Sequence, residues 1–202
     1  EPILGTKPNR SQFVLLNSPD ENVVARSIAE LEYHAAVLDL MGLDASAKIQ
    51  IHIGGVYGDR HAALGRFIDE YKALPHAIRR RLVIENDERL YPVSDCLDIS
   101  KKIGVPVLFD SFHHAIFNTG ESLGDLLDSV SRTWKPADGL MMIDYSSQAP
   151  GKRTGAHAEK IDPDDFLRFL ERTGSRDMDI MLEIKDKEKS AREAIRIAAG
   201  DP

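Results

Sequence analysis

The chain has 202 residues, of which 42% are hydrophobic, and this is enough for one domain with a substantial core. The mean hydropathy is -0.30, and no apolar run reaches the roughly 18 residues that a membrane-spanning helix needs. Acidic residues outnumber basic residues by 33 to 26. The resulting net charge of -7 argues against a nucleic-acid partner, unless bound cations reverse the charge locally.

The compartment is indicated by two features. Residues 1–5 lack the basic-then-apolar layout of a secretory signal. Cys96 is the only cysteine, so no internal disulfide can form. Both features predict a cytoplasmic protein in a reducing environment. The sequence has no low-complexity linker, and we expect residues 1–202 to form a single monomeric domain.

Short apolar runs alternate along the chain with longer amphipathic segments. The short runs are typical of parallel strands buried on both faces, whereas apolar residues spaced near 3.6 indicate helices. In chain order the pattern predicts a weak strand at 13–16, a helix at 20–41, a strand at 48–53, a helix at 60–74, a strand at 81–86, a helix at 94–103, a strand at 105–110, a helix at 122–134, a strand at 139–144, a helix at 162–170 and a strand at 179–184.

The ends of these helices carry local signals. Ser94 and Asp162 are expected N-caps, Pro163 suits the first helical position, and Gly42 is expected to end the first helix. Repeated strand–helix units of this length predict either a doubly wound sheet or a (β/α)8 barrel.

Polar residues at the strand ends distinguish these two folds. A closed barrel gathers the C-terminal ends of its strands at one mouth, whereas an open sheet spreads them along a line. The sequence therefore favours an α/β fold of the TIM (β/α)8 barrel type. Such a barrel usually has about 250 residues, so we expect it to be incomplete, with the N-terminal strands missing. The strand-end residues of ligand type are His52, Glu85, Asp110, Asp144 and Glu183.

Each of these residues also has a structural interpretation. His52 lies in an apolar strand, where a histidine is more often a hydrogen-bonded core residue. Asp144 is as easily a helix cap in the following loop, and Glu183 precedes a charged run that would ordinarily start a solvated helix. In contrast, a carboxylate such as Glu85 at the end of a buried strand is rarely buried unless it is paired or binds a metal.

Histidines near the same strand ends extend the set. Asp110 stands three residues before His113, so a carboxylate and an imidazole can converge on one site. His157 lies in a loop, where a lone histidine usually has no special role. Together these residues form a mixed nitrogen and oxygen set that suits manganese or zinc and can hold two to three ions. Clustered divalent ions suit phosphodiester hydrolysis.

Several local sequences, in this order, resemble the UV-damage endonucleases. That family shares a barrel and a trinuclear metal site with the endonuclease IV type of abasic-site nuclease, and it is related to the xylose isomerase-like barrels. The ordered series is more specific than any one motif, and the similarity extends from about Phe13 to Ala194. The matching segments are 13–19, 31–35, 51–55, 66–68, 82–87, 109–114, 132–134 and 182–187.

The resemblance implies a metal-dependent DNA-repair hydrolase. Its expected activity is to nick double-stranded DNA immediately 5′ to UV photoproducts, pyrimidine dimers and 6-4 products, with manganese as the expected ion. Glu85 and Glu183 are the expected catalytic carboxylates. The implied ligands are His52 for the first metal, Glu85 between the first and second, Asp110, Asp144 and Glu183 for the second, and His113 and His157 for the third.

The resemblance also implies contacts with DNA. Gln12 and Phe13 match the pair of residues with which the family probes the damaged duplex, where an aromatic wedge and an amide replace unstacked bases. Basic residues on loops at the same end are expected to contact flanking phosphates without reading the sequence. These residues are Lys152, Arg153, Lys185 and Lys187.

Two positions depart from the family. Asn9-Arg10 stands where relatives have a histidine followed by proline, so the first metal would lose one ligand. Met142 stands where some relatives carry a modified lysine. Two other interpretations stay open. One is a metal-dependent sugar isomerase or epimerase of the same barrel type, and the other is a non-catalytic protein that binds damaged DNA.

Overall fold

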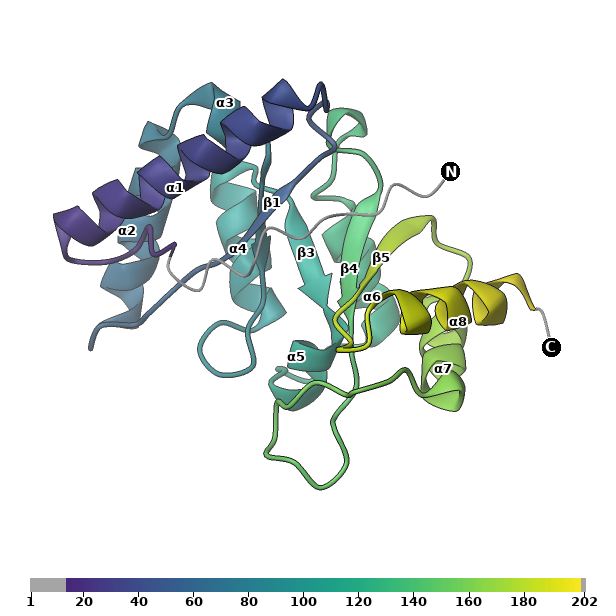
Figure 1. Cartoon of the computed structure of the whole chain (residues 1–202). Coiled ribbons are helices and arrows are strands. Elements are labelled where there is room, and N and C mark those ends of the chain that lie inside the picture. Colours follow the sequence, from purple (N-terminus) through teal and green to yellow (C-terminus); the bar gives the residue numbers. More distant parts are fainter. Residues whose placement is uncertain (1–13, 201–202) are drawn as a thin grey trace.

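The structure, a computed structural model, describes residues 14–200 (Figure 1). Its strands are β1 (Ile49–His52), β2 (Leu82–Glu85), β3 (Val107–Asp110), β4 (Met141–Tyr145) and β5 (Met178–Leu182). Its helices are α1 (Glu21–Leu40), α2 (Arg60–Ala73), α3 (His76–Arg79), α4 (Val93–Ile103), α5 (Ser111–Ile116), α6 (Leu123–Ser131), the 3-10 helix η1 (Pro136–Asp138), α7 (Pro163–Thr173) and α8 (Glu188–Ala199).

The five strands form one parallel sheet in the order β1-β2-β3-β4-β5. All five strongly predicted strands are therefore confirmed, each within a few residues of its expected bounds. The weak strand predicted at 13–16 is wrong for its described part, because residues 14–16 belong to no strand. The backbone N–H of Leu15 instead donates to Ser27 Oγ on α1 at 2.9 Å.

The five predicted helices are also confirmed as α1, α2, α4, α6 and α7. Asp162 caps α7 as expected and accepts from the backbone N–H of Asp165 at 3.0 Å, with Pro163 in the first helical turn. The predicted cap at Ser94 is wrong, because α4 begins one residue earlier and its N-cap is Pro92, without a side-chain hydrogen bond. Val93, the first residue of α4, is fully buried in the core.

Side-chain contacts show that the sheet is strongly curved. Strands β1 and β4 are separated by β2 and β3, so in a flat sheet they would lie about 14 Å apart. Yet Lys48 Nζ is 2.6 Å from Asp138 Oδ1, just before β4, and Gln50 Nε2 is 2.7 Å from Asp144 Oδ2. The strands thus form an arc of a barrel wall, and the inner face of β1 points toward that of β4.

The helices accompany the strands in chain order, with α1 and α2 beside β1 and α7 and α8 toward β5 (Figure 1). Apolar side chains between the helices and the sheet form the main core, including Leu31, Phe67, Ile99, Leu127 and Phe166. The C-terminal ends of the strands meet α5 and the loop that follows β4 at one end of the molecule. Within residues 14–200, no helix has the length and apolarity that a membrane span requires.

Candidate metal centre

The parallel register places the strand-end residues side by side. His52 is paired with Glu85 across β1 and β2, and Asp110 is paired with Asp144 across β3 and β4. Glu183 follows β5 directly, and its backbone N–H donates to the carbonyl of Tyr145 at 2.8 Å. All five predicted strand-end residues therefore lie at the same end of the sheet.

Five ligand-type residues fall into two overlapping groups. The first ligand group is Glu85, Asp110 and His113, and the second ligand group is Asp110, Asp144 and Glu183. In each group the candidate ligand atoms lie within 4.8 Å of one another, and Asp110 belongs to both. Four of the five residues are buried. Carboxylates are rarely buried together in this way without a compensating positive charge.

The two carboxylate oxygens of Asp110 have different surroundings. It is the last residue of β3 and the N-cap of α5, where Oδ1 accepts from the backbone N–H groups of Phe112 and His113, both at 2.8 Å. This cap folds the chain directly from strand into helix and brings the His113 ring back over the strand ends. The Asn86 amide reinforces the turn, since it pairs with both the backbone N–H and the carbonyl of Asp110 at 3.0 Å.

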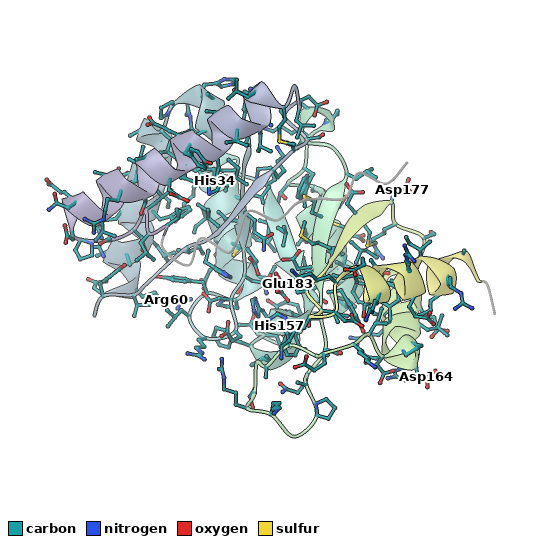
Figure 2. All side chains as sticks on the ribbon, viewed as in Figure 1. His34, Arg60, His157, Asp164, Asp177 and Glu183 are labelled. Carbon is teal, nitrogen blue, oxygen red and sulfur yellow. The ribbon has the colours of Figure 1, made fainter. Side chains whose placement is uncertain are left out.

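The two loop-side histidines are oriented by backbone carbonyls. His113 Nδ1 lies 3.0 Å from the carbonyl of Asn86, and His157 Nδ1 lies 3.0 Å from the carbonyl of Glu183. Since a carbonyl only accepts, each Nδ1 must carry a proton that it donates to that carbonyl. This arrangement is typical of metal-binding histidines. Figure 2 shows His157 beside Glu183, near the strand ends, and far from peripheral Asp164 and Asp177.

His52 does not behave as a hydrogen-bonded core residue. Its Nε2 lies 3.6 Å from Glu85 Oε2, and its ring centroid lies 5.9 Å from that of His113. Its Nδ1 is buried and has no hydrogen-bond partner. The geometry thus places His52 at the edge of the first ligand group, next to Glu85.

Burial and charge shift the pKa values of this cluster in opposite directions. Burial, together with the neighbouring Glu85 carboxylate, raises the pKa of Asp110 well above its usual value. Burial acts in the same direction on Glu85, but the positive charges of His52 and His113 outweigh it and lower the Glu85 pKa. For His113, burial lowers the pKa, but the nearby Glu85 and Asp110 carboxylates and the Asn86 carbonyl raise it overall, to about 9.

Unused lone pairs test whether these residues fit a metal ion. Glu85 Oε1 and Asp110 Oδ2 are buried and accept no hydrogen bond, although His113 Nδ1 lies 3.3 and 3.1 Å from them. The single Nδ1 proton is directed to Asn86. Buried acceptors without donors are costly, and a divalent cation satisfies them. The donor set of carboxylates and imidazoles therefore fits manganese or zinc.

Sequence reasoning missed two polar side chains at this end. Gln50 on β1 donates from Nε2 to Glu85 Oε2 at 2.5 Å and to Asp144 Oδ2 at 2.7 Å. Glu88 Oε2 lies 3.6 Å from His113 Nε2. The available signal for Gln50 was its spacing, because residues two apart on a strand share a face and Gln50 stands two before His52.

A cavity of about 500 Å³ opens beside the two loop-side histidines. Of the predicted DNA contacts, Arg153 and Lys185 line it, whereas Lys152 and Lys187 do not. Lys185 also forms an ion pair with Glu159. The full lining is Glu88, Arg89, His113, Arg153, Gly155, Ala156, His157 and Lys185.

Other predicted positions lie away from this cavity or outside the described range. Met142 is half-buried within β4. The predicted probe Gln12-Phe13 and the departure at Asn9-Arg10 lie outside the described residues 14–200.

Known proteins are similar to this chain over most of its length. A UV DNA damage endonuclease of Clostridium perfringens (strain 13 / Type A) is 42% identical over 182 residues, which is 89% of this chain and 44% of the relative. One of Bacillus velezensis is 34% identical over 191 residues, covering 93% of this chain and 59% of the relative. The chain thus spans roughly half the length of these curated relatives.

Solved structures agree on the fold. The crystal structure of SacUVDE superposes with a TM-score of 0.88 at 49% identity, over 94% of this chain and 63% of that one. A D-psicose 3-epimerase of Clostridium cellulolyticum H10, solved with D-tagatose, gives a TM-score of 0.60 at 14% identity, over 95% of this chain and 74% of that one. The second likeness shows the fold alone, and it confirms the predicted barrel class.

The family assignment rests on sequence and geometry together. The model of UV-endonuclease UvdE matches residues 4–198. The same stretch contains the strand-end carboxylates and histidines that meet at one end of the curved sheet. The chain therefore belongs to the UV-endonuclease UvdE family.

Proposed function

We propose that this chain carries the catalytic metal centre of a DNA-repair endonuclease that nicks double-stranded DNA 5′ to UV photoproducts. The observation that supports this most directly is the meeting of the two ligand groups at the strand ends of a UvdE-family chain. Two to three divalent ions, most suitably manganese, are the proposed cofactors. When bound, such ions supply Lewis-acid activation of a phosphodiester and of water.

The proposed ligands follow the geometry of the strand ends. Glu85 would bind one ion together with His52 and another together with the rest of the first ligand group. The second ligand group would bind the neighbouring ion, and Asp110 belongs to both groups. His113 and His157 present their Nε2 atoms to the cavity side. Glu85 and Glu183 are the proposed catalytic carboxylates.

The protein's own contribution is orientation. Backbone carbonyls accept the Nδ1 protons of His113 and His157 and so fix the orientation of both rings at the strand ends. The capping hydrogen bonds fix Asp110, and burial keeps water away from the carboxylates. A preorganised site of this kind loses little energy to rearrangement when charge develops on the phosphate.

Substrate binding is proposed to use the basic side of the cavity. Arg89, Arg153 and Lys185 offer positive charge next to the histidines, which suits phosphates flanking the cut. The net charge of -7 does not oppose this, because several negative charges are concentrated in the buried ligand groups. Lesion recognition would use the lower cost of unstacking a photoproduct, with Gln12 and Phe13 as the proposed probe.

The first test is cleavage of a labelled duplex with a single pyrimidine dimer in the presence of Mn²⁺. We expect one nick on the 5′ side of the dimer and none in undamaged duplex. Replacing Glu85 by glutamine keeps the size of the side chain but removes a buried negative charge. Nicking should therefore fall by about 100-fold or more, as metal-ligand losses commonly do.

The control is Glu171→Gln, the same change at an exposed position of α7. It should cut at the wild-type rate. A Glu85→Gln variant that also cuts at the wild-type rate would refute the assignment. Binding of the duplex without any metal-dependent nick would favour the non-catalytic alternative, and turnover of a free ketose without nicking would favour a sugar epimerase.

A further inference from the structure

The inner face of β1 carries a side chain that contacts both ligand groups. We propose that Gln50 is a positioning residue that fixes the first and second ligand groups relative to each other. This inference rests on the proposed function, because it concerns the same metal centre. It extends that function by assigning the spacing of the ions to a residue that binds none of them.

The contacts of Gln50 determine the orientation of its side-chain amide. Its Nε2 lies 2.5 Å from Glu85 Oε2 and 2.7 Å from Asp144 Oδ2. An ionised carboxylate only accepts hydrogen bonds, so the amide must direct its nitrogen toward both. The NH2 group has two protons, and one can be donated to each carboxylate. The amide orientation thus follows from the chemistry of its neighbours.

These two hydrogen bonds join different parts of the barrel wall. Glu85 belongs to the first ligand group on β2, and Asp144 belongs to the second ligand group on β4. Gln50 stands on β1, which pairs with β2 but is separated from β4 by two strands. The hydrogen bonds of Gln50 thus reach from β1 to a carboxylate of each group.

A neutral donor suits this position better than a charged one. A lysine or arginine would also bind both carboxylates, but its positive charge would repel the cations that the site is proposed to hold. Gln50 engages Glu85 through Oε2 and leaves Oε1, which is buried and accepts no hydrogen bond. The amide therefore orients the carboxylate while leaving a lone pair for a ligand bond, as outer-shell partners do in metal sites.

The test measures metal binding directly. Mn²⁺ is titrated into the wild-type protein and into Gln50→Met, which keeps the length of the side chain but donates no hydrogen bond. We expect Mn²⁺ affinity to fall by about 10- to 100-fold, the usual effect of losing an outer-shell partner. Electron paramagnetic resonance of the Mn²⁺-saturated proteins should show an altered coupling between ions, since the two groups are no longer held at the same spacing.

A matched control separates positioning from folding. Lys48 lies two residues before Gln50, just ahead of β1, and its ammonium donates to Asp138 and to the carbonyl of Arg80. Lys48→Met is the same kind of change next to the same strand, away from the ligand groups. It should lower thermal stability but leave Mn²⁺ affinity and ion coupling unchanged.

A more conservative variant tests the same inference if Gln50→Met does not fold. Gln50→Asn keeps the amide but is one methylene shorter, so it cannot reach both carboxylates at once, and it should weaken Mn²⁺ binding while folding normally. A folded Gln50 variant with wild-type affinity and coupling would overturn this inference alone. A wild-type protein that binds no Mn²⁺ would overturn the proposed function, and this inference with it.

Discussion

Asp110 illustrates how one residue serves both the fold and the site. Its Oδ1 caps α5 through two backbone N–H groups, while Oδ2 is buried without a donor between the two ligand groups. The sequence spacing of Asp110 and His113 predicted that they converge, and the structure confirms it at 3.1 Å between Oδ2 and His113 Nδ1. The spacing could not reveal that the cap is what brings them together.

This division of labour predicts the behaviour of Asp110→Asn. The amide oxygen can still accept the capping hydrogen bonds, so the free energy of unfolding should change by less than about 1 kcal/mol. The negative charge is lost, so Mn²⁺ affinity should fall by at least about tenfold. Chemical denaturation and calorimetric titration of the same sample measure the two effects.

Asp110→Ala is the comparison, because it removes the cap as well. It should lose Mn²⁺ affinity to a similar degree and, in addition, about 1 kcal/mol of stability. Equal stability losses in the asparagine and alanine variants would show that the cap does not depend on Oδ1.

Gln50 and Glu88 show where residue-level prediction stopped. Carboxylates and histidines at strand ends were identified because they are common metal ligands. Gln50 was not identified, because glutamine is a rare ligand. Its importance depends on the curvature of the sheet, which brings β1 toward β4 and is not visible in a linear pattern. Glu88 lies in a loop, and only the three-dimensional path of that loop places it near His113.

At the scale of elements, long periodic segments were predictable and short ones were not. The five strands and the five predicted helices follow from apolar spacing. Helices α3 and α5 span four and six residues, too few for a period to be recognised. Helix α8 (Glu188–Ala199) was foreseen only as a charged helix start, since few of its side chains are buried.

Arg81 joins several elements at the N-terminal end of the sheet, opposite the candidate site. Its side chain is fully buried, and its guanidinium donates to the Asp39 carboxylate and to the carbonyls of Leu43, Asp44 and Ala47. These bonds fasten the loop between α1 and β1 beneath the strands. Such a buried arginine is a structural residue that composition alone does not reveal.

Replacing Arg81 by methionine should therefore destabilise the protein. The carbonyls of Leu43, Asp44 and Ala47 would lose their donors, and we expect the free energy of unfolding to fall by about 2–4 kcal/mol, measured by chemical denaturation. Arg80 also pairs with Asp39, but at a half-exposed position. Arg80→Met should cost less than about 1 kcal/mol. A comparable loss of stability in both variants would show that the contacts of Arg81 with the carbonyls of Leu43, Asp44 and Ala47 do not stabilise the fold.

At the scale of the whole molecule, the most informative feature of the sequence was the ligand-type residues at the C-terminal ends of the strands. Parallel strands in register must bring their C-terminal ends together, so ligand-type residues at those ends had to meet if the sheet curved. The strand-end residues favoured a curved barrel over an open sheet, but the contacts that the curvature creates between β1 and β4 could not be read from the sequence. The resemblance to UV-damage endonucleases implied the same barrel, and the family match and the solved structures support it.

The proposed metal centre depends on divalent ions shared by side chains from separate strands. The most direct test is a crystal of this protein soaked with MnCl2, with an anomalous difference map calculated from data at the manganese absorption edge. We predict strong peaks within bonding distance, about 2.0–2.3 Å, of Glu85, Asp110 and Glu183, at the end of the sheet where the strands finish. A map without peaks there, or with peaks only on surface carboxylates, would contradict the proposed metal centre.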